Sequence, residues 1–160
     1  MAMRLMIKQR VLSFGDKFDI YDEFGNVKYF AKGELFSFGH KLHVYDMHDR
    51  EIGSVHEKVL SFPKQFEIVM GGAVRGYITK QFTLFYQKYD VDFNGWHVDG
   101  DFLEWNFDVV SGGRPIIRIH KEWLAWGDTY VIDIDNPEDE IMGLMLVLAI
   151  DAANCNHNKN

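Results

Sequence analysis

Short segments of alternating hydrophobic and polar residues run along most of the chain, and each is followed by a turn signal and a second alternating segment. Alternation with a period of two is typical of strands with one buried face, and two such segments around a tight turn are typical of a β-hairpin. Phe18 to Asp22, for example, precedes Gly25-Asn26 and a second segment that begins at Val27. Asn94-Gly95 is the strongest kind of short hairpin signal. The pattern therefore predicts a mainly β protein built from hairpins.

The predicted hairpins belong to an internal repeat. Similar segments begin at residues 12, 36, 60, 82, 102 and 124, and Leu60-Ser61-Phe62 is one clear copy. This spacing fits one two-stranded unit per repeat. Five hairpins, an outgoing strand over Thr129 to Asp135 and an opening strand around Arg4 to Gln9 predict twelve strands. Because an open sheet leaves two exposed edges, we expect a closed twelve-stranded antiparallel barrel.

The hydrophobic segment from Ile141 to Ile150 does not alternate, and Asn136 to Glu140 precedes it. Asn is a good N-cap, Pro suits the first helical position, and acidic residues suit the N-terminal end of the helix dipole. A helix that is apolar all round is enclosed by protein or spans a membrane, and a span needs about 20 apolar residues. We therefore expect a hydrophobic C-terminal α-helix inside the barrel, whose lumen is too wide for the wall alone to fill. The chain is then a single domain over residues 1–160, with the barrel over about 3–135 and the central helix over about 137–153.

This arrangement resembles the bacterial branch of the LURP-one-related family, which has the tubby-like barrel around a hydrophobic helix. The resemblance is carried by Leu60-Ser61-Phe62, Gly95-Trp96, Trp123 to Tyr130 and Pro137 to Glu140, among others. It implies the fold, but no general biochemical activity is attached to the family. Tubby proteins bind phosphoinositides through a basic pocket, and the similar phospholipid scramblases are associated with membranes and calcium. Neither set of binding residues matches positions here, so neither activity carries over.

The chain has 24 acidic and 17 basic side chains and a formal net charge of -7, which argues against non-specific binding to nucleic acid or anionic membranes by bulk charge, but not against a local basic patch. We expect no nucleic acid partner. Its one cysteine, Cys155, cannot form an internal disulfide, and residues 1–10 lack the apolar core of a signal peptide. We therefore expect a cytoplasmic protein without a transmembrane segment, for which peripheral association with a membrane stays open.

Lysines nevertheless gather toward one rim of the predicted barrel. They fall near the ends of returning strands and the starts of outgoing strands, while the turns at the other rim carry acids such as Asp22, Asp46 and Asp92. A lysine-rich rim can hold a phosphate-bearing headgroup, although lysines at strand ends also serve as solvated residues that discourage edge pairing. The predicted ligand-binding residues are Lys17, Lys32, Lys41, Lys58, Lys64, Lys80, Lys88 and Lys121.

Other residue groups indicate no catalytic or metal chemistry. The acid-rich segment between Tyr89 and Gly113 lacks the spacing of a calcium loop. Histidines are scattered over the repeats, and His40 and His43 fall on opposite faces of a strand. Aromatic residues at the lysine-rich rim are expected to plug the barrel, with a grip on single-stranded nucleic acid or contact with a bilayer surface as the alternatives. They are Phe14, Phe36, Phe38, Phe62, Trp105, Trp123 and Trp126. We predict no metal, no cofactor and no enzymatic activity.

The leading hypothesis is a non-enzymatic tubby-like binding module that recognises an anionic ligand, such as a lipid headgroup, through the lysine-rich rim. The alternative is a protein interaction scaffold whose exposed hairpins engage a partner and which has no small-molecule ligand. Salt distinguishes the two hypotheses, because binding of a charged headgroup weakens as the salt concentration rises whereas an apolar interface does not weaken.

Overall fold

The computed structural model describes residues 2–8, 17–36, 39–81, 83–84, 87–102, 104–124 and 127–155. Within these residues twelve strands form one antiparallel sheet, and a short 3₁₀ helix leads from the last strand into an α-helix. The elements are β1 (Met3–Lys8), β2 (Lys17–Asp22), β3 (Val27–Phe36), β4 (Gly39–Asp46), β5 (Glu51–Lys58), β6 (Gln65–Met70), β7 (Ala73–Gln81), β8 (Lys88–Val91), β9 (His97–Asp101), β10 (Asn106–Ser111), β11 (Arg114–Leu124), β12 (Gly127–Ile134), η1 (Pro137–Asp139) and α1 (Glu140–Cys155).

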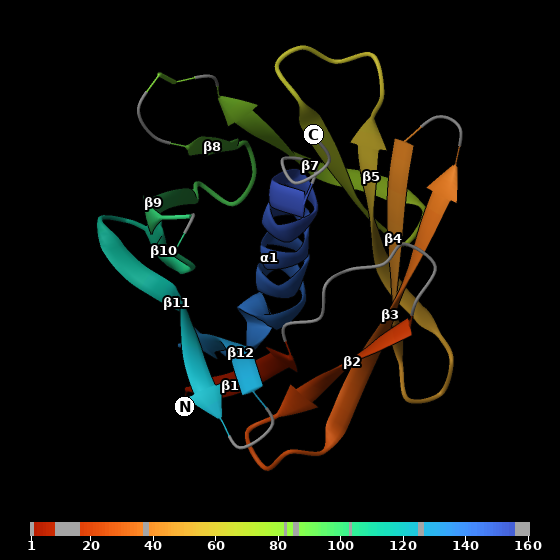
Figure 1. Ribbon diagram of the computed structural model, residues 1–160, viewed down its shortest axis with the longest axis vertical. Coiled ribbons are helices and arrows are strands. Elements are labelled where there is room, and N and C mark those ends of the chain that lie inside the picture. Colours follow the sequence, from red (N-terminus) through yellow and green to blue (C-terminus); the bar gives the residue numbers. More distant parts are fainter. Residues whose placement is uncertain are drawn as a thin grey trace.

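The sheet wraps around α1 (Figure 1). Its strand order is β8-β7-β6-β5-β4-β3-β2-β1-β12-β11-β10-β9, so strands that follow each other in the sequence pair throughout, except β8 with β9. The wrap is completed by β1, which pairs with β2 on one side and with β12 on the other. Met3 lies opposite Ile134, and Lys8 lies opposite Thr129. The predicted twelve-stranded antiparallel barrel around a C-terminal helix is confirmed.

The barrel is nearly closed rather than closed, because no ladder joins β8 to β9 in the part of the chain that the structure describes. The predicted turn at Asn94-Gly95 is present, with φ of 55° and 64°, and the Trp96 N–H donates to the Phe93 carbonyl at 3.1 Å. After β8 the chain keeps its contact with β7 through Asp92. Its N–H donates to the Tyr77 carbonyl at 3.3 Å, and its carboxylate accepts from the Tyr77 N–H at 2.6 Å.

The helical segment begins as the sequence predicts. The Asn136 side chain accepts a hydrogen bond from the Glu138 N–H at 3.1 Å, and the proline occupies the first turn. Glu140 then ties the helix to β3, because its Oε1 accepts from the Tyr29 hydroxyl at 2.8 Å and lies 2.6 Å from Lys28 Nζ. Since Lys28 and Tyr29 lie near the start of β3, the helix enters the barrel at the rim with the acid-bearing turns.

α1 is enclosed by the wall. From Leu144 to Ile150 no residue is more than 3% exposed. Glycines allow close contact with two strands that lie six places apart in the sheet order. A Cβ at Gly143 would lie 2.6 Å from Ile117 Cδ1 in β11, and one at Gly53 in β5 would lie 2.9 Å from Met145 Cε. Among the described residues, no helix is long and apolar enough to cross a membrane.

Candidate functional site

The strand register places the predicted lysines toward one end of the barrel, the end at which α1 finishes. Lys17 at the start of β2 lies opposite Lys32 in the second half of β3. Around the wall, the start of each strand that carries a lysine likewise lies beside the later part of the preceding strand, as for Lys88 opposite Gln81. Lys80 Nζ lies 3.5 Å from the carbonyl oxygen of Ala153, in the last turn of α1. The lysines and the acid-bearing helix start are thus at opposite ends of the protein.

These lysines do not all face the same side of the wall. Because side chains alternate along a strand, Lys80 shares the face of the buried Ile78, and Lys121 shares the face of the buried Ile119. Both therefore lie on the lumen side of the rim. The same reasoning from register places five lysines on the outer face: Lys17, Lys32, Lys41, Lys58 and Lys88.

Two of the predicted lysines, Lys64 and Lys80, make contacts within the fold. Lys64 Nζ lies 2.8 Å from Glu57 Oε1, and both side chains are largely covered. Lys80 donates to a carbonyl at the C-terminal end of α1, where a positive charge complements the helix dipole. Burial, together with the nearby Lys64, lowers the pKa of Lys80. We infer that Lys64 stabilises the fold through its ion pair, and that Lys80 is oriented by the helix end although burial disfavours its charge.

Lys17 and Lys32 form the most concentrated part of the outer set. Their Nζ atoms lie 4.0 Å and 5.8 Å from the centre of the Phe30 ring. Tyr45 of β4 stacks on Phe30 with 5.2 Å between ring centres, and Lys32 Nζ lies 5.7 Å from the Tyr45 ring. The aromatic rings attract both ammonium groups, whereas like charges directly opposite each other repel. We call Lys17, Phe30, Lys32 and Tyr45 the lysine–aromatic patch.

Beside this patch the register brings together side chains that the sequence analysis treated as scattered. His43 lies opposite Lys32 and has one ring nitrogen 3.0 Å from Glu51 Oε1 and the other 3.2 Å from Glu34 Oε2. The His56 ring is 6.1 Å from that of His43, and burial is the main cause that lowers the pKa of His56. In the described ranges no group of three or more His, Cys, Asp or Glu side chains could hold a metal ion. Pairing residues back from the turn of hairpin β4–β5 would have missed the histidine cluster, because the register shifts between Val44 and Tyr45.

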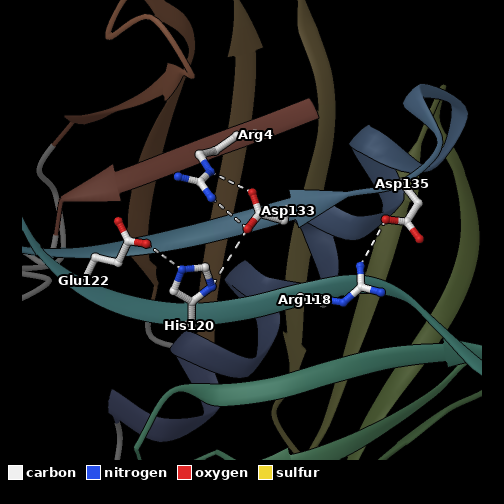
Figure 2. Close-up of polar contacts among 6 residues, drawn as sticks. All are labelled: Arg4, Arg118, His120, Glu122, Asp133 and Asp135. Atoms are coloured by element: carbon white, nitrogen blue, oxygen red, sulfur yellow. Dashed lines mark hydrogen bonds and ion pairs between the residues drawn. The ribbon is translucent and has the colours of Figure 1, made fainter. Parts of the chain in front are cut away.

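A polar network on the outer face joins the first strand to the last two (Figure 2). Arg4 donates to both oxygens of Asp133, at 2.7 Å and 3.0 Å. His120 Nδ1 lies 4.0 Å from the same carboxylate, and its Nε2 lies 2.8 Å from Glu122 Oε1. Since these residues come from β1, β12 and β11, we infer that the network stabilises the closure between the two ends of the chain.

The acid-rich segment is used in local hydrogen bonds. Besides the Asp92 contact with β7, the Asp90 carboxylate accepts from the Gln81 side chain, and the Asp101 carboxylate accepts from the Glu104 N–H at 3.1 Å. These contacts order the region around the gap between β8 and β9.

A small recess in the lumen lies beside the last turns of α1. Its lining includes Trp105, Tyr130 and Asp151, and its volume of about 20 Å³ is room for one water molecule. The Trp105 and Tyr130 rings stack with 4.1 Å between centres, and burial raises the pKa of Asp151 to about 7. Ligand pockets are usually about 300 to 1,000 Å³, so this recess does not suit a substrate.

The aromatic residues of the lysine-rich rim behave in two ways. Trp105 is 6% exposed and closes the lumen, as predicted. Phe62 is 84% exposed, so its predicted plugging role is wrong. The loop that carries it projects away from the barrel instead. Phe14, Phe38 and Trp126 lie outside the described residues.

Comparisons with known proteins agree with this fold. The sequence profile of the LURP-one-related family matches residues 3–151. Uncharacterized protein YxjI of Bacillus subtilis strain 168 is 30% identical over 149 residues, which are 93% of this chain and 92% of that protein. The X-ray structure of the Arabidopsis thaliana protein AT5G01750 superposes with a TM-score of 0.65 at 16% identity, covering 95% of this chain and 91% of that one. The chain therefore belongs to the LURP-one-related family.

Proposed function

We propose that this protein is a non-enzymatic binding module and that its lysine–aromatic patch captures a phosphate-bearing anion. The observation that carries the proposal is the placement of Lys17 directly opposite Lys32, with both ammonium groups held near one phenylalanine ring. Two like charges so arranged repel each other. An anion that contacts both would convert that repulsion into two charge-assisted hydrogen bonds.

The geometry suits a single phosphate group. Side chains directly opposite each other in an antiparallel pair have Cβ atoms about 5 Å apart, so two flexible lysines can reach oxygens of the same phosphate. The stacked Phe30 and Tyr45 rings limit the directions that the lysine side chains take. The patch is therefore partly organised before an anion arrives, which reduces the entropic cost of binding.

The other outer lysines support this role at longer range. Lys41, Lys58 and Lys88 lie toward the same end of the wall, away from the acid-bearing turns. A positive end on a protein of negative net charge orients it toward an anionic surface. At a membrane each lysine near the surface contributes about 1 kcal/mol of attraction.

The test uses two kinds of probe, because a phosphate can belong to a soluble molecule or to a lipid. Inositol hexakisphosphate is titrated against the protein by calorimetry, and flotation is measured with phosphatidylcholine vesicles that contain phosphorylated phosphatidylinositol. The variant is Lys17→Glu with Lys32→Glu, and the charge-matched control is Arg75→Glu with Arg114→Glu, two exposed basic residues beside the turns of the opposite rim. We expect the patch variant to bind the preferred probe at least about tenfold more weakly, a difference of about 1.4 kcal/mol, and the control to stay within about twofold of the wild type.

Equal losses in the two variants would mean that bulk charge, and not the patch, attracts the anion. Wild-type protein that binds neither probe at low salt would also overturn the proposal. A search for a protein partner would then be the next step.

A further inference from the structure

Two loops at the lysine-bearing end expose large apolar side chains. Between β5 and β6, Leu60 is 99% exposed and Phe62 is 84% exposed, and between β7 and β8, Leu84 is 93% exposed. We call Leu60, Phe62 and Leu84 the apolar tips. The loops belong to neighbouring strands, because β6 pairs with β7 and the Lys80 N–H donates to the Lys64 carbonyl at 2.8 Å. In Figure 1 the yellow β5–β6 loop stands at the end where α1 finishes.

The β5–β6 loop has internal hydrogen bonds that hold its shape. The Ser61 hydroxyl donates to the Lys58 carbonyl at 2.9 Å and accepts from the Gln65 N–H at 3.0 Å. The Ser61 N–H also donates to the Lys58 carbonyl, at 3.3 Å. This turn keeps Leu60 and Phe62 directed outward, so a partner that covers them need not order the loop first.

Exposed lysines flank the apolar tips. Lys58 precedes the first loop with a side chain 42% exposed, and the exposed Lys88 begins the strand after the second loop. A lysine places its charge at a polar boundary while its methylene groups follow apolar surface. Apolar residues beside exposed lysines are typical of segments that enter the interface of an anionic bilayer.

The opposite rim also has exposed apolar side chains, but in a different electrostatic setting. Phe24 is 80% exposed and Met47 is 57% exposed. Their turns carry Asp22, Glu23 and Asp49. An anionic membrane would repel that rim, so charge complementarity favours the lysine-bearing end.

The shape of the tips also indicates which occupant fits them. Single exposed apolar residues are ordinary on protein surfaces. Among the described residues these three stand on two separate segments between strands, so a protein partner would have to fit both segments at once. A fluid bilayer accommodates both segments without such a fit.

We propose that Leu60, Phe62 and Leu84 insert into the interfacial layer of an anionic lipid bilayer. This proposal rests on the proposed function, which requires that the bound surface is negatively charged. It places the capture of the anion at a membrane rather than in solution. It adds an apolar contact that the lysines do not supply.

The first experiment measures flotation with vesicles of phosphatidylcholine and phosphatidylserine. The tip variant replaces Leu60, Phe62 and Leu84 with serine, and the control variant carries Phe24→Ser and Met47→Ser. All five side chains are largely exposed, so we expect both variants to fold, which thermal melting checks. We expect the tip variant to partition at least about tenfold more weakly than wild type, and the control to stay within about twofold. Tip and control variants that float equally well would overturn the proposal.

A second experiment reports insertion directly. Phe62→Trp adds an indole to the loop, whose fluorescence is compared with that of the wild type on vesicles with brominated acyl chains. We expect additional quenching and a blue shift of the added emission. A variant that floats with the vesicles but shows neither change would overturn insertion of this loop.

The two proposals fail in different ways. If Lys17→Glu with Lys32→Glu abolishes flotation while the tip variant floats as wild type does, insertion is wrong and the patch stands. If the tip variant loses flotation and the patch variant keeps it, insertion stands and the patch is not the headgroup site. Wild-type protein that does not float with anionic vesicles at low salt would overturn insertion.

Discussion

Asp151 is the side chain whose replacement tests most directly how the helix is held in the barrel. It lies near the end of α1 and lines the recess beside Trp105 and Tyr130. Burial raises its pKa from the ordinary 3.8 to about 7. The same surroundings raise the pKa of Tyr89, mainly through burial and then through the charge of Asp151. Around pH 7.5 the protein therefore carries an aspartate charge in a place that favours the neutral acid.

The sign of the effect follows from proton linkage. Because the folded-state pKa lies above the unfolded one, the folded protein binds more protons between about pH 4 and pH 7. The contribution of Asp151 to stability is fully present below about pH 4 and is lost as the pH rises to about 7. Since one pKa unit corresponds to 1.36 kcal/mol, a shift of about three units amounts to a loss of at most about 4 kcal/mol. Asp151→Asn keeps a neutral side chain of similar shape at every pH.

The assay is urea unfolding of the wild type and of Asp151→Asn at several pH values from 4 to 8. We expect the variant to be more stable by about 2 to 4 kcal/mol at pH 8 and close to wild type at pH 4. In the difference between the unfolding free energies of the two proteins, the contributions of the other titrating groups cancel. Asp49→Asn, in an exposed turn, is the matched control. A variant no more stable than wild type at pH 8, or a gain that does not depend on pH, would refute the reasoning.

Three further predictions concern the fold. Leu146→Asp places a charge at a position with 0% exposure in the lumen, so we expect circular dichroism to show no cooperative melting; wild-type melting would contradict the enclosed helix. Asn136→Ala removes the acceptor for the Glu138 N–H and should cost about 1 kcal/mol in urea unfolding, whereas Asn136→Ser should retain most of the stability. Arg4→Met removes both hydrogen bonds to Asp133 and should cost about 1 kcal/mol by the same assay; unchanged stability would make the pair an ordinary surface contact.

The strands and the helix start could be predicted because their signals are local. Alternation and turn residues identify each hairpin within two dozen residues, and Asn136 caps the turn that directly follows it. The gap between β8 and β9 could not be predicted in this way. The Asn94-Gly95 turn has the expected conformation, but Asp92 bonds to Tyr77 fifteen positions earlier in the chain. A turn signal thus fixes the conformation of the turn itself, but it does not fix whether the strands on its two sides form a ladder.

The sequence could not predict, for a related reason, whether each rim lysine points to the lumen or to the outer face of the wall. Each of the hairpins β2–β3, β4–β5, β6–β7 and β10–β11 has a register shift close to its turn. Such bulges add a residue on one strand, so counting back from the turn assigns side chains beyond it to the wrong face. Lys58 and Lys80 both stand two residues before a repeat start, yet Lys58 lies on the outer face and Lys80 lies on the lumen side.

This difference decides which lysines can meet a ligand. A lysine on the lumen side, such as Lys80, donates to the carbonyl end of α1, and burial there lowers its pKa, so this charge faces the helix and not the surroundings of the protein. Lys17 and Lys32 are on the outer face and opposite each other, where the two like charges repel while the Phe30 ring attracts both. Two like charges placed opposite each other are a physical reason to test for an anion there. The repeat identifies the rim, but only the register distinguishes the lysines that face the helix from the pair on the outer face.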